Sequence, residues 1–217
     1  DCTRSIGCVN LAFPFPDGID RTMPLFVESD SLLYPSLGIA AASLHPDGGA
    51  PVWDREHREV KVGEHCVPVN GDGHAYLHFS SVIPFYPMSE VAKAHAELLS
   101  GERPTIGRED FEGRIVFVGN SAPSLGDLGT NPVSEKESGG RSPNVMMHAR
   151  TAATLLDNTA LAYHGRGSAL LLSALLTLGL ALLFRFVPMQ YSFLTAFLVM
   201  GGMLVVSRHL YVNGHFV

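Results

Sequence analysis

The residues whose side chains are best suited to binding or catalysis lie in segment 113–134, where an apolar run ends in glycine and polar residues follow. Asn120, Ser121 and Asp127 stand in this segment. Such a pattern suggests a phosphate-binding loop or a turn that presents a nucleophilic serine. A phosphate loop of the Walker type requires a lysine directly after its second glycine. None follows Gly126, so this first possibility fails.

The second possibility is that Ser121 belongs to a nucleophile elbow, the turn of hydrolases whose pattern is G-x-S-x-G. Gly119 and Ser121 supply the first half, but Pro123 stands where the second glycine belongs. Proline has a fixed φ and no N–H, which does not suit the helix entry that carries the oxyanion donor. We therefore predict no catalytic residue, and keep as the alternative a membrane-anchored hydrolase that uses Ser121 with His148 or His78.

Two roles remain for this loop. Its backbone N–H groups, together with the side chains of Asn120, Ser121 and Asp127, can bind a small polar group. The same side chains can instead fold the loop onto itself through Asx and ST turns, and we favour this second role.

The ten histidines invite a search for metal ligands. His74 and His78 fall on one face of an expected strand, and His57, His65 and Cys66 are near one another in sequence. No pair has the close spacing of a zinc site, and neither H-E-x-x-H nor C-x-x-C occurs. We predict surface or capping histidines, with no metal and no cofactor.

Charged residues and cysteines add little chemistry. Asp17, Asp20 and Arg21 follow one another closely and predict a charge-paired turn rather than an acid–base site. Cys2 and Cys8 can pair outside the cytoplasm, but three cysteines are an odd number and free thiols are the better expectation. The net charge of −6 and the scattered basic residues argue against nucleic acid as a partner.

The elements that must position these residues alternate between strand-like and helix-like patterns. The predicted class is α/β, with a mixed sheet and flanking helices. We expect strands at 9–13, 22–27, 60–62, 67–69 and 75–79, and helices at 37–44, 89–99 and 143–158. Ser89 should cap the second helix and Gly101 should end it.

Three further segments have expected conformations. The sequence NGDGH at residues 70–74 predicts a hairpin turn between two of these strands; it resembles the start of a calcium loop but lacks the later acidic ligands. The run IVFV at residues 115–118 predicts a fully buried, parallel strand. Residues 135–142 are polar and glycine-bearing and should form a loose segment.

The C-terminal quarter predicts a transmembrane helical hairpin. Spans at about 168–184 and 190–207 carry no charge, and Arg185 and a proline lie in the short link between them. About 17 residues are the lower limit for crossing a hydrocarbon layer of ~30 Å. We therefore divide the chain into an α/β domain at 1–163 and a membrane region at 164–217. Basic residues do not decide which side is cytoplasmic.

Taken together, three segments and the following membrane spans resemble the second CHASE class (CHASE type 2) of extracellular sensory domains. The segments read FPDGIDRTMPLF, FEGRIVFVGNSAPSLGDLGTNPVS and SPNVMMHARTAATLLDN. The matching positions are Asp17, Gly18, Arg21, Val118, Gly119, Ala122, Asp127, Pro132, Pro143, Val145, His148 and Ala149. The local departures are Asn131, Asn144, Met146 and Arg150, and a ligand pocket shaped by them would differ from that of the family.

This resemblance implies a sensory input module of a transmembrane receptor rather than an enzyme. Residues 1–163 would lie on the periplasmic or extracellular side of the inner or plasma membrane, with Arg185 inside. The output would be a nucleotide cyclase or a protein kinase such as a histidine kinase. The expected ligand contacts are Asn120, Ser121, Asp127, Asp17, Arg21 and His148.

The expected partners are the lipid bilayer and an unknown small molecule or other extracellular stimulus. A further alternative is a purely structural ectodomain that holds a homodimer of output domains together. We also expect the chain to be a fragment that lacks the first half of the sensor domain, with a third span truncated.

Overall fold

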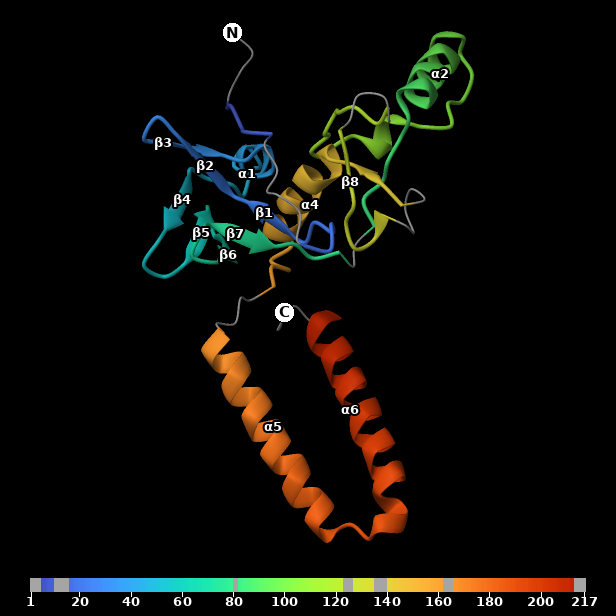
Figure 1. Cartoon of the computed structure of the whole chain (residues 1–217). Helices are drawn as coiled ribbons and strands as arrows, with labels where there is room; N and C mark the ends of the chain where they lie inside the picture. Colours follow the sequence, from blue (N-terminus) through green and yellow to red (C-terminus); the bar gives the residue numbers. More distant parts are fainter. Residues whose placement is uncertain are drawn as a thin grey trace.

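The computed structural model describes residues 5–9, 16–79, 82–122, 127–134, 140–161 and 166–212. Figure 1 shows an α/β domain followed by two long helices. Most of the predicted strand at 9–13, most of the loose segment at 135–142 and the pairing of Cys2 lie outside the described residues. Cys8 and Cys66 are free cysteines.

The α/β class is confirmed, but the single mixed sheet is wrong, because the described strands form four small antiparallel sheets. The pairs are β1 (Thr22–Pro24) with β7 (His74–Tyr76), β2 (Phe26–Ser29) with β3 (Leu32–Pro35), and β8 (Leu128–Gly129) with β9 (Ser142–Pro143). The fourth sheet joins β4 (Pro51–Asp54), β5 (Glu59–Val62) and β6 (His65–Pro68).

Short turns set the register of these sheets. Ser29 opposes Leu32, and both residues between them, Asp30 and Ser31, have positive φ, as a two-residue hairpin turn of the primed type requires. At the β5–β6 turn, Gly63 has a φ of 61° and opens another two-residue loop. β2 with β3 and β5 with β6 therefore pair through short turns, whereas β1 pairs with the distant β7.

Two predictions about the strands are partly wrong. The strand expected at 22–27 is interrupted at Leu25, which separates β1 from β2. The turn at 70–74 is present, with the Asn70 side chain accepting hydrogen bonds from the N–H groups of Asp72 and His74. The prediction that this turn joins two paired strands is wrong, however, because β7 pairs with β1 instead of β6.

The predicted buried parallel strand at 115–118 is also wrong. These residues belong to no strand, and no backbone hydrogen bond joins them to another described residue. Val116 and Val118 are 53% and 74% exposed, whereas Ile115 and Phe117 are half-buried. An apolar run indicates burial only when other elements cover both of its faces, and here one face is open.

Three helices complete the domain: α1 (Leu37–Ala42), α2 (Met88–Leu99) and α4 (Val145–Leu156). All three were expected from the sequence. The predicted cap of α2 is wrong, because the N-cap residue is Pro87 and Ser89 lies inside the helix. Gly101 ends α2 as predicted, with a φ of 77° and the N–H of Glu102 bonded to the carbonyl of Glu97.

Helix α4 is the central element of the domain. It packs on α1 through Gly38, where a Cβ would lie only 2.5 Å from the carbonyl oxygen of His148. Its last turn buries Leu155 completely, in one cluster with Val60 and Val62 of β5. The alternation of β5 sends its valines inward and its charged residues outward, so the sheet covers α4 with an apolar face.

Two long helices follow the domain. α5 (Arg166–Phe186) and α6 (Ser192–Val212) run in opposite directions in Figure 1, joined by a link that includes the short 3-10 helix η3 (Met189–Tyr191). The two expected helical segments are therefore present. Within the described residues, Ser192–His209 is the one segment long and apolar enough to cross a membrane, and none of it is buried; Leu170–Phe186 is a shorter apolar helix.

Candidate functional site

The N-terminal end of α4 brings two of the sequence motifs together. Asn144 is the N-cap residue, and its backbone N–H donates to the Asp127 carbonyl at 3.1 Å. The Asn144 side-chain amide donates to the Asp127 carboxylate at 3.0 Å. The pairing of β8 with β9 holds these two segments side by side. Asp127 therefore fixes the start of α4.

The turn that holds Asp17 and Arg21 forms the charge pair expected from the sequence. Two guanidinium nitrogens of Arg21 contact the two oxygens of Asp17 at 2.7 and 3.0 Å, on the surface. The hydrogen bonds from Arg21 and from the N–H of Ile19 lower the pKa of Asp17 below 3.8. With both of its oxygens paired, the carboxylate is a poor candidate for acid–base chemistry.

A third contact connects this turn to the segment after β8. The N–H of Asp20 donates to the Thr130 carbonyl at 2.7 Å. Gly129 has no room for a side chain, because a Cβ there would lie 2.6 Å from Asn144 Oδ1 and 3.0 Å from Asp20 Oδ2. Burial raises the pKa of Asp20 above 3.8. Three motifs far apart in sequence therefore converge on the start of α4.

His148 lies one turn into α4 and is only 2% exposed. Its Nε2 lies 3.3 Å from the Val9 carbonyl, and its buried Nδ1 has no hydrogen-bond partner among the described residues. Burial lowers the pKa of His148 below 6.5, an effect that the carbonyl of Val9 and the charge of Asp127 partly oppose. A neutral, buried imidazole is chiefly a packing group at this position.

Asn120 and Ser121 differ in their contacts. Asn120 Oδ1 accepts a hydrogen bond from the N–H of Ala122 at 2.9 Å, which is the Asx turn favoured above for this loop. Ser121 instead lines a cavity. Among the described residues, no hydrogen bond joins Ser121 to His148 or His78, so the arrangement that the hydrolase alternative requires is not present there.

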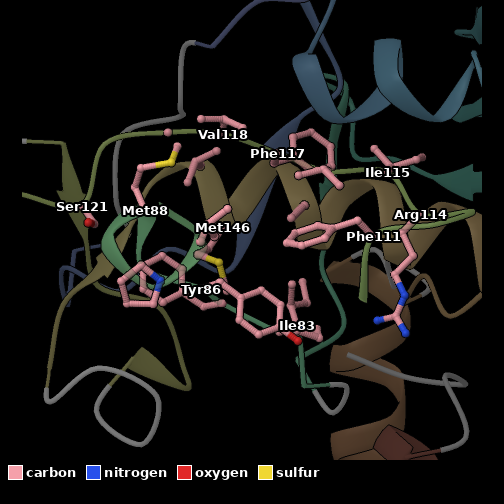
Figure 2. Close-up of a pocket in the computed structure, with 18 of the residues that line it drawn as sticks. Ile83, Tyr86, Met88, Phe111, Arg114, Ile115, Phe117, Val118, Ser121 and Met146 are labelled. Carbon is pink, nitrogen blue, oxygen red and sulfur yellow. The ribbon is translucent and has the colours of Figure 1, made fainter. Parts of the chain in front are cut away.

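The cavity has a volume of about 290 Å³ and lies against the first turns of α4. Figure 2 shows Tyr86, Phe111 and Met146 around this space, with Ser121 and Arg114 at opposite ends. Three segments line it: residues 83–91, residues 110–121 and the start of α4. The lining side chains of α4 are Val145, Met146 and Ala149.

The wall of the cavity is mostly aromatic and aliphatic, and two of its polar groups satisfy each other. The Tyr86 hydroxyl donates to an Asp110 oxygen at 3.2 Å, and the Tyr86 ring lies 5.8 Å from that of Phe111. Burial and the charge of Asp110 raise the pKa of Tyr86, so its hydroxyl keeps its proton. The second Asp110 oxygen accepts from the N–H of Gly107 at 2.9 Å. This wall suits an apolar ligand better than a charged one.

Sequence reasoning missed this cavity almost completely. Of the predicted site residues only Ser121 lines it; Asp127 and His148 lie at the adjacent start of α4, and Asp17 and Arg21 pair at the surface. The available signal was the run VIPFYPM at residues 82–88, which is apolar but interrupted by two prolines. Such a run does not form a central strand, so its side chains are available to line a space.

The described part of the chain is therefore an α/β domain whose last helix, α4, is followed by the two long apolar helices α5 and α6. The model of the CHASE2 domain matches residues 2–188. The chain therefore belongs to the CHASE2 family. CHASE2 domains are extracellular sensory domains of signalling receptors and are not catalytic. Comparisons with curated proteins and with solved structures found no significant match.

Proposed function

We propose that residues 1–163 form the extracytoplasmic sensory input module of a transmembrane signalling protein. The stimulus acts on the α/β domain, α4 passes the change to α5 and α6, and these helices pass it to a cytoplasmic output domain. The observation that carries this proposal is the position of α4. Its first turns line the cavity, its last turn packs in the core, and the chain leads from its end to α5.

The two long helices support the membrane part of this proposal. Residues 167–184 of α5 and 192–207 of α6 contain no charged side chain. Their large apolar residues face outward; Leu170 and Phe197, for example, are 69% and 67% exposed. Helices with apolar side chains on all sides are stable in lipid and not in water. We place residues 1–163 outside the inner or plasma membrane and the link near Arg185 inside.

The cavity supports a class of ligand as well. An engineered protein cavity of about 150 Å³ binds benzene, so a space of about 290 Å³ accommodates a molecule of roughly two rings or a medium-length alkyl chain. Met88 and Met146 add flexible, polarisable side chains that adapt to an apolar surface. We propose a small, uncharged, apolar stimulus at this site. A ligand shifts the domain only if it binds two states with unequal affinity.

The placement of the domain is tested by labelling cysteines in intact cells. The three native cysteines are replaced by serine, and Glu56→Cys or Gln190→Cys is added. A maleimide that does not cross membranes should label position 56 in intact cells and position 190 only after lysis. Labelling of both positions from the same side would contradict the proposed topology.

The signalling role is tested in the protein that carries the output domain, a nucleotide cyclase or a protein kinase. One to four residues are inserted between positions 165 and 167, and an equal insertion at the exposed Gly71 turn serves as the control. The first insertion should uncouple stimulus from output, because each added helical residue rotates the downstream part of the helix by about 100°. Unchanged regulation by both insertions would refute transmission through this joint.

A further inference from the structure

The exposed face of the β4–β6 sheet carries a cluster of potential metal ligands. Asp54 opposes Glu59, and Lys61 opposes Cys66 in the strand register. Because side chains alternate along a strand, all four project on the face away from Val60 and Val62, which are buried. The turn between β4 and β5 adds a fifth side chain, the imidazole of His57.

The donor atoms of this cluster are close together. His57 Nδ1 lies 2.8 Å from Asp54 Oδ2, and Cys66 Sγ lies 3.0 Å from Glu59 Oε2. One ligand atom from each of Asp54, His57 and Glu59 lies within 4.8 Å of the others. Ligand atoms in a tetrahedral zinc shell are about 3.4 Å apart, because each is about 2.0–2.3 Å from the metal. Small side-chain rotations therefore bring the donor atoms of Asp54, His57 and Glu59 to this spacing, and Cys66, which lies outside this group of three but contacts Glu59, is the candidate for the fourth ligand.

We propose that Asp54, His57, Glu59 and Cys66 form a binding site for a divalent metal ion of the zinc type. Two carboxylate oxygens, one imidazole nitrogen and one sulfur are a donor set that suits zinc better than magnesium or calcium, which prefer oxygen alone. The spacing of these residues in sequence gives no zinc motif because the four ligands come from three strands and a turn. This inference does not depend on the proposed sensory function.

The ammonium group of Lys61 is the cation that pairs with these carboxylates in the structure. Lys61 Nζ lies 2.6 Å from Glu59 Oε1 and 3.5 Å from Asp54 Oδ2. A lysine has a flexible four-carbon stem, and the side chain of Lys61 is 48% exposed, so the ammonium can move into solvent when a metal replaces it. The metal and the ammonium compete for the same carboxylates.

Binding involves one covalent change at the cysteine. The S–H bond of Cys66 breaks, a metal–thiolate bond forms, and the proton passes to solvent, so charge and atoms balance without an oxidant or reductant. Cobalt is a suitable probe for this step, since a cobalt–thiolate bond gives a charge-transfer absorption in the near ultraviolet.

The experiment titrates the full chain, in detergent or lipid discs, with Co²⁺ and then with Zn²⁺ as competitor. We expect one ion per chain, a thiolate band that zinc removes, and loss of this band in Cys66→Ser. His57→Gln should weaken binding by at least about tenfold. His65→Gln is the matched control, because His65 lies beside Cys66 but contacts Asn158, and it should bind cobalt normally.

A further variant addresses the competition with the ammonium. Lys61→Gln should tighten cobalt binding several-fold, because the ammonium no longer competes for the carboxylates. For every variant, an unchanged midpoint of urea unfolding shows that the fold is intact. The site is refuted if the band persists in Cys66→Ser, if His57→Gln and His65→Gln bind alike, or if no thiolate band forms at all.

Discussion

The two sides of α4 are built differently. On one side, β5, β6 and α1 bury Val60, Val62 and Ile39 completely against the helix. On the other side, the segment 115–118 leaves Val116 and Val118 more than half exposed around a cavity. We call these the packed side and the open side. Stability comes from the first, and the second has the space and the apolar surface that a ligand requires.

The largest expected effect contrasts a leucine of the packed side with a valine of the open side. Leu155→Ala removes a completely buried side chain and should lower the free energy of unfolding by about 2–5 kcal/mol. Val118→Ala, at 74% exposure, should change it by less than about 0.5 kcal/mol. Urea unfolding in detergent can be followed through Trp53, the single tryptophan, which stacks on Phe26. Equal effects of the two variants would remove the contrast between the sides.

The next effect tests the close packing of α1 on α4. Gly38→Ala places a Cβ within 2.5 Å of the His148 carbonyl and should cost about 1–3 kcal/mol of unfolding free energy. Gly71→Ala is the control, since nothing lies within 4 Å of a Cβ there. If urea unfolding shows that both variants are equally stable, then α1 and α4 are not held as closely as described.

A smaller effect separates two acidic residues of the family motifs. Asp127→Ala removes the partner of the Asn144 side chain and should cost about 1 kcal/mol. Asp17→Ala breaks an ion pair and a hydrogen bond from the N–H of Ile19 at the surface, where solvent screens the charges, and should cost less. A larger cost for Asp17→Ala in the same urea assay would mean that the surface turn, not the start of α4, is the stabilising contact.

The smallest effect concerns pH. Burial lowers the pKa of His148 in the folded protein below 6.5, so below that pH the unfolded chain binds protons that the folded domain does not. The free energy of unfolding should therefore fall as the pH drops from about 6.5, and His148→Gln should flatten this fall. His95→Gln, on an exposed position of α2, should leave the pH profile unchanged. His74, whose pKa burial also lowers, contributes in the same direction, whereas the raised pKa of Asp20 acts in the opposite direction.

The sequence predicted the packed side better than the open side. Helices with apolar spacing and clear ends, such as 37–44 and 143–158, were found because their pattern reflects the face that they bury. The two terminal helices were found for a different reason, because each contains a long apolar run without a charged side chain. The pairing of β7 with β1 could not be predicted from the local sequence of either strand, since it joins residues about 50 positions apart.

The candidate site shows the same limit. The contact between Asp127 and Asn144 follows from motif order only when the pairing of β8 with β9 is known. The run IVFV predicted a buried strand because its composition does not reveal whether a second strand lies beside it. The cavity was missed because it is lined by three segments separated in sequence, and none of them has a recognisable motif.

Hydrogen–deuterium exchange of the whole chain, in lipid discs, tests most directly the claim that a ligand acts on α4 from the open side. Without ligand, amides at 115–119 should exchange fast, and those of β5 and α4 slowly. Naphthalene, a neutral apolar probe of two rings, should slow exchange at residues 83–91, 115–121 and 145–149. Ala149→Phe, which fills the cavity, should abolish this protection, whereas Ala92→Phe on the exposed face of α2 should not. Protection that is absent, or that is the same in Ala149→Phe as in the unmodified chain, would contradict the account.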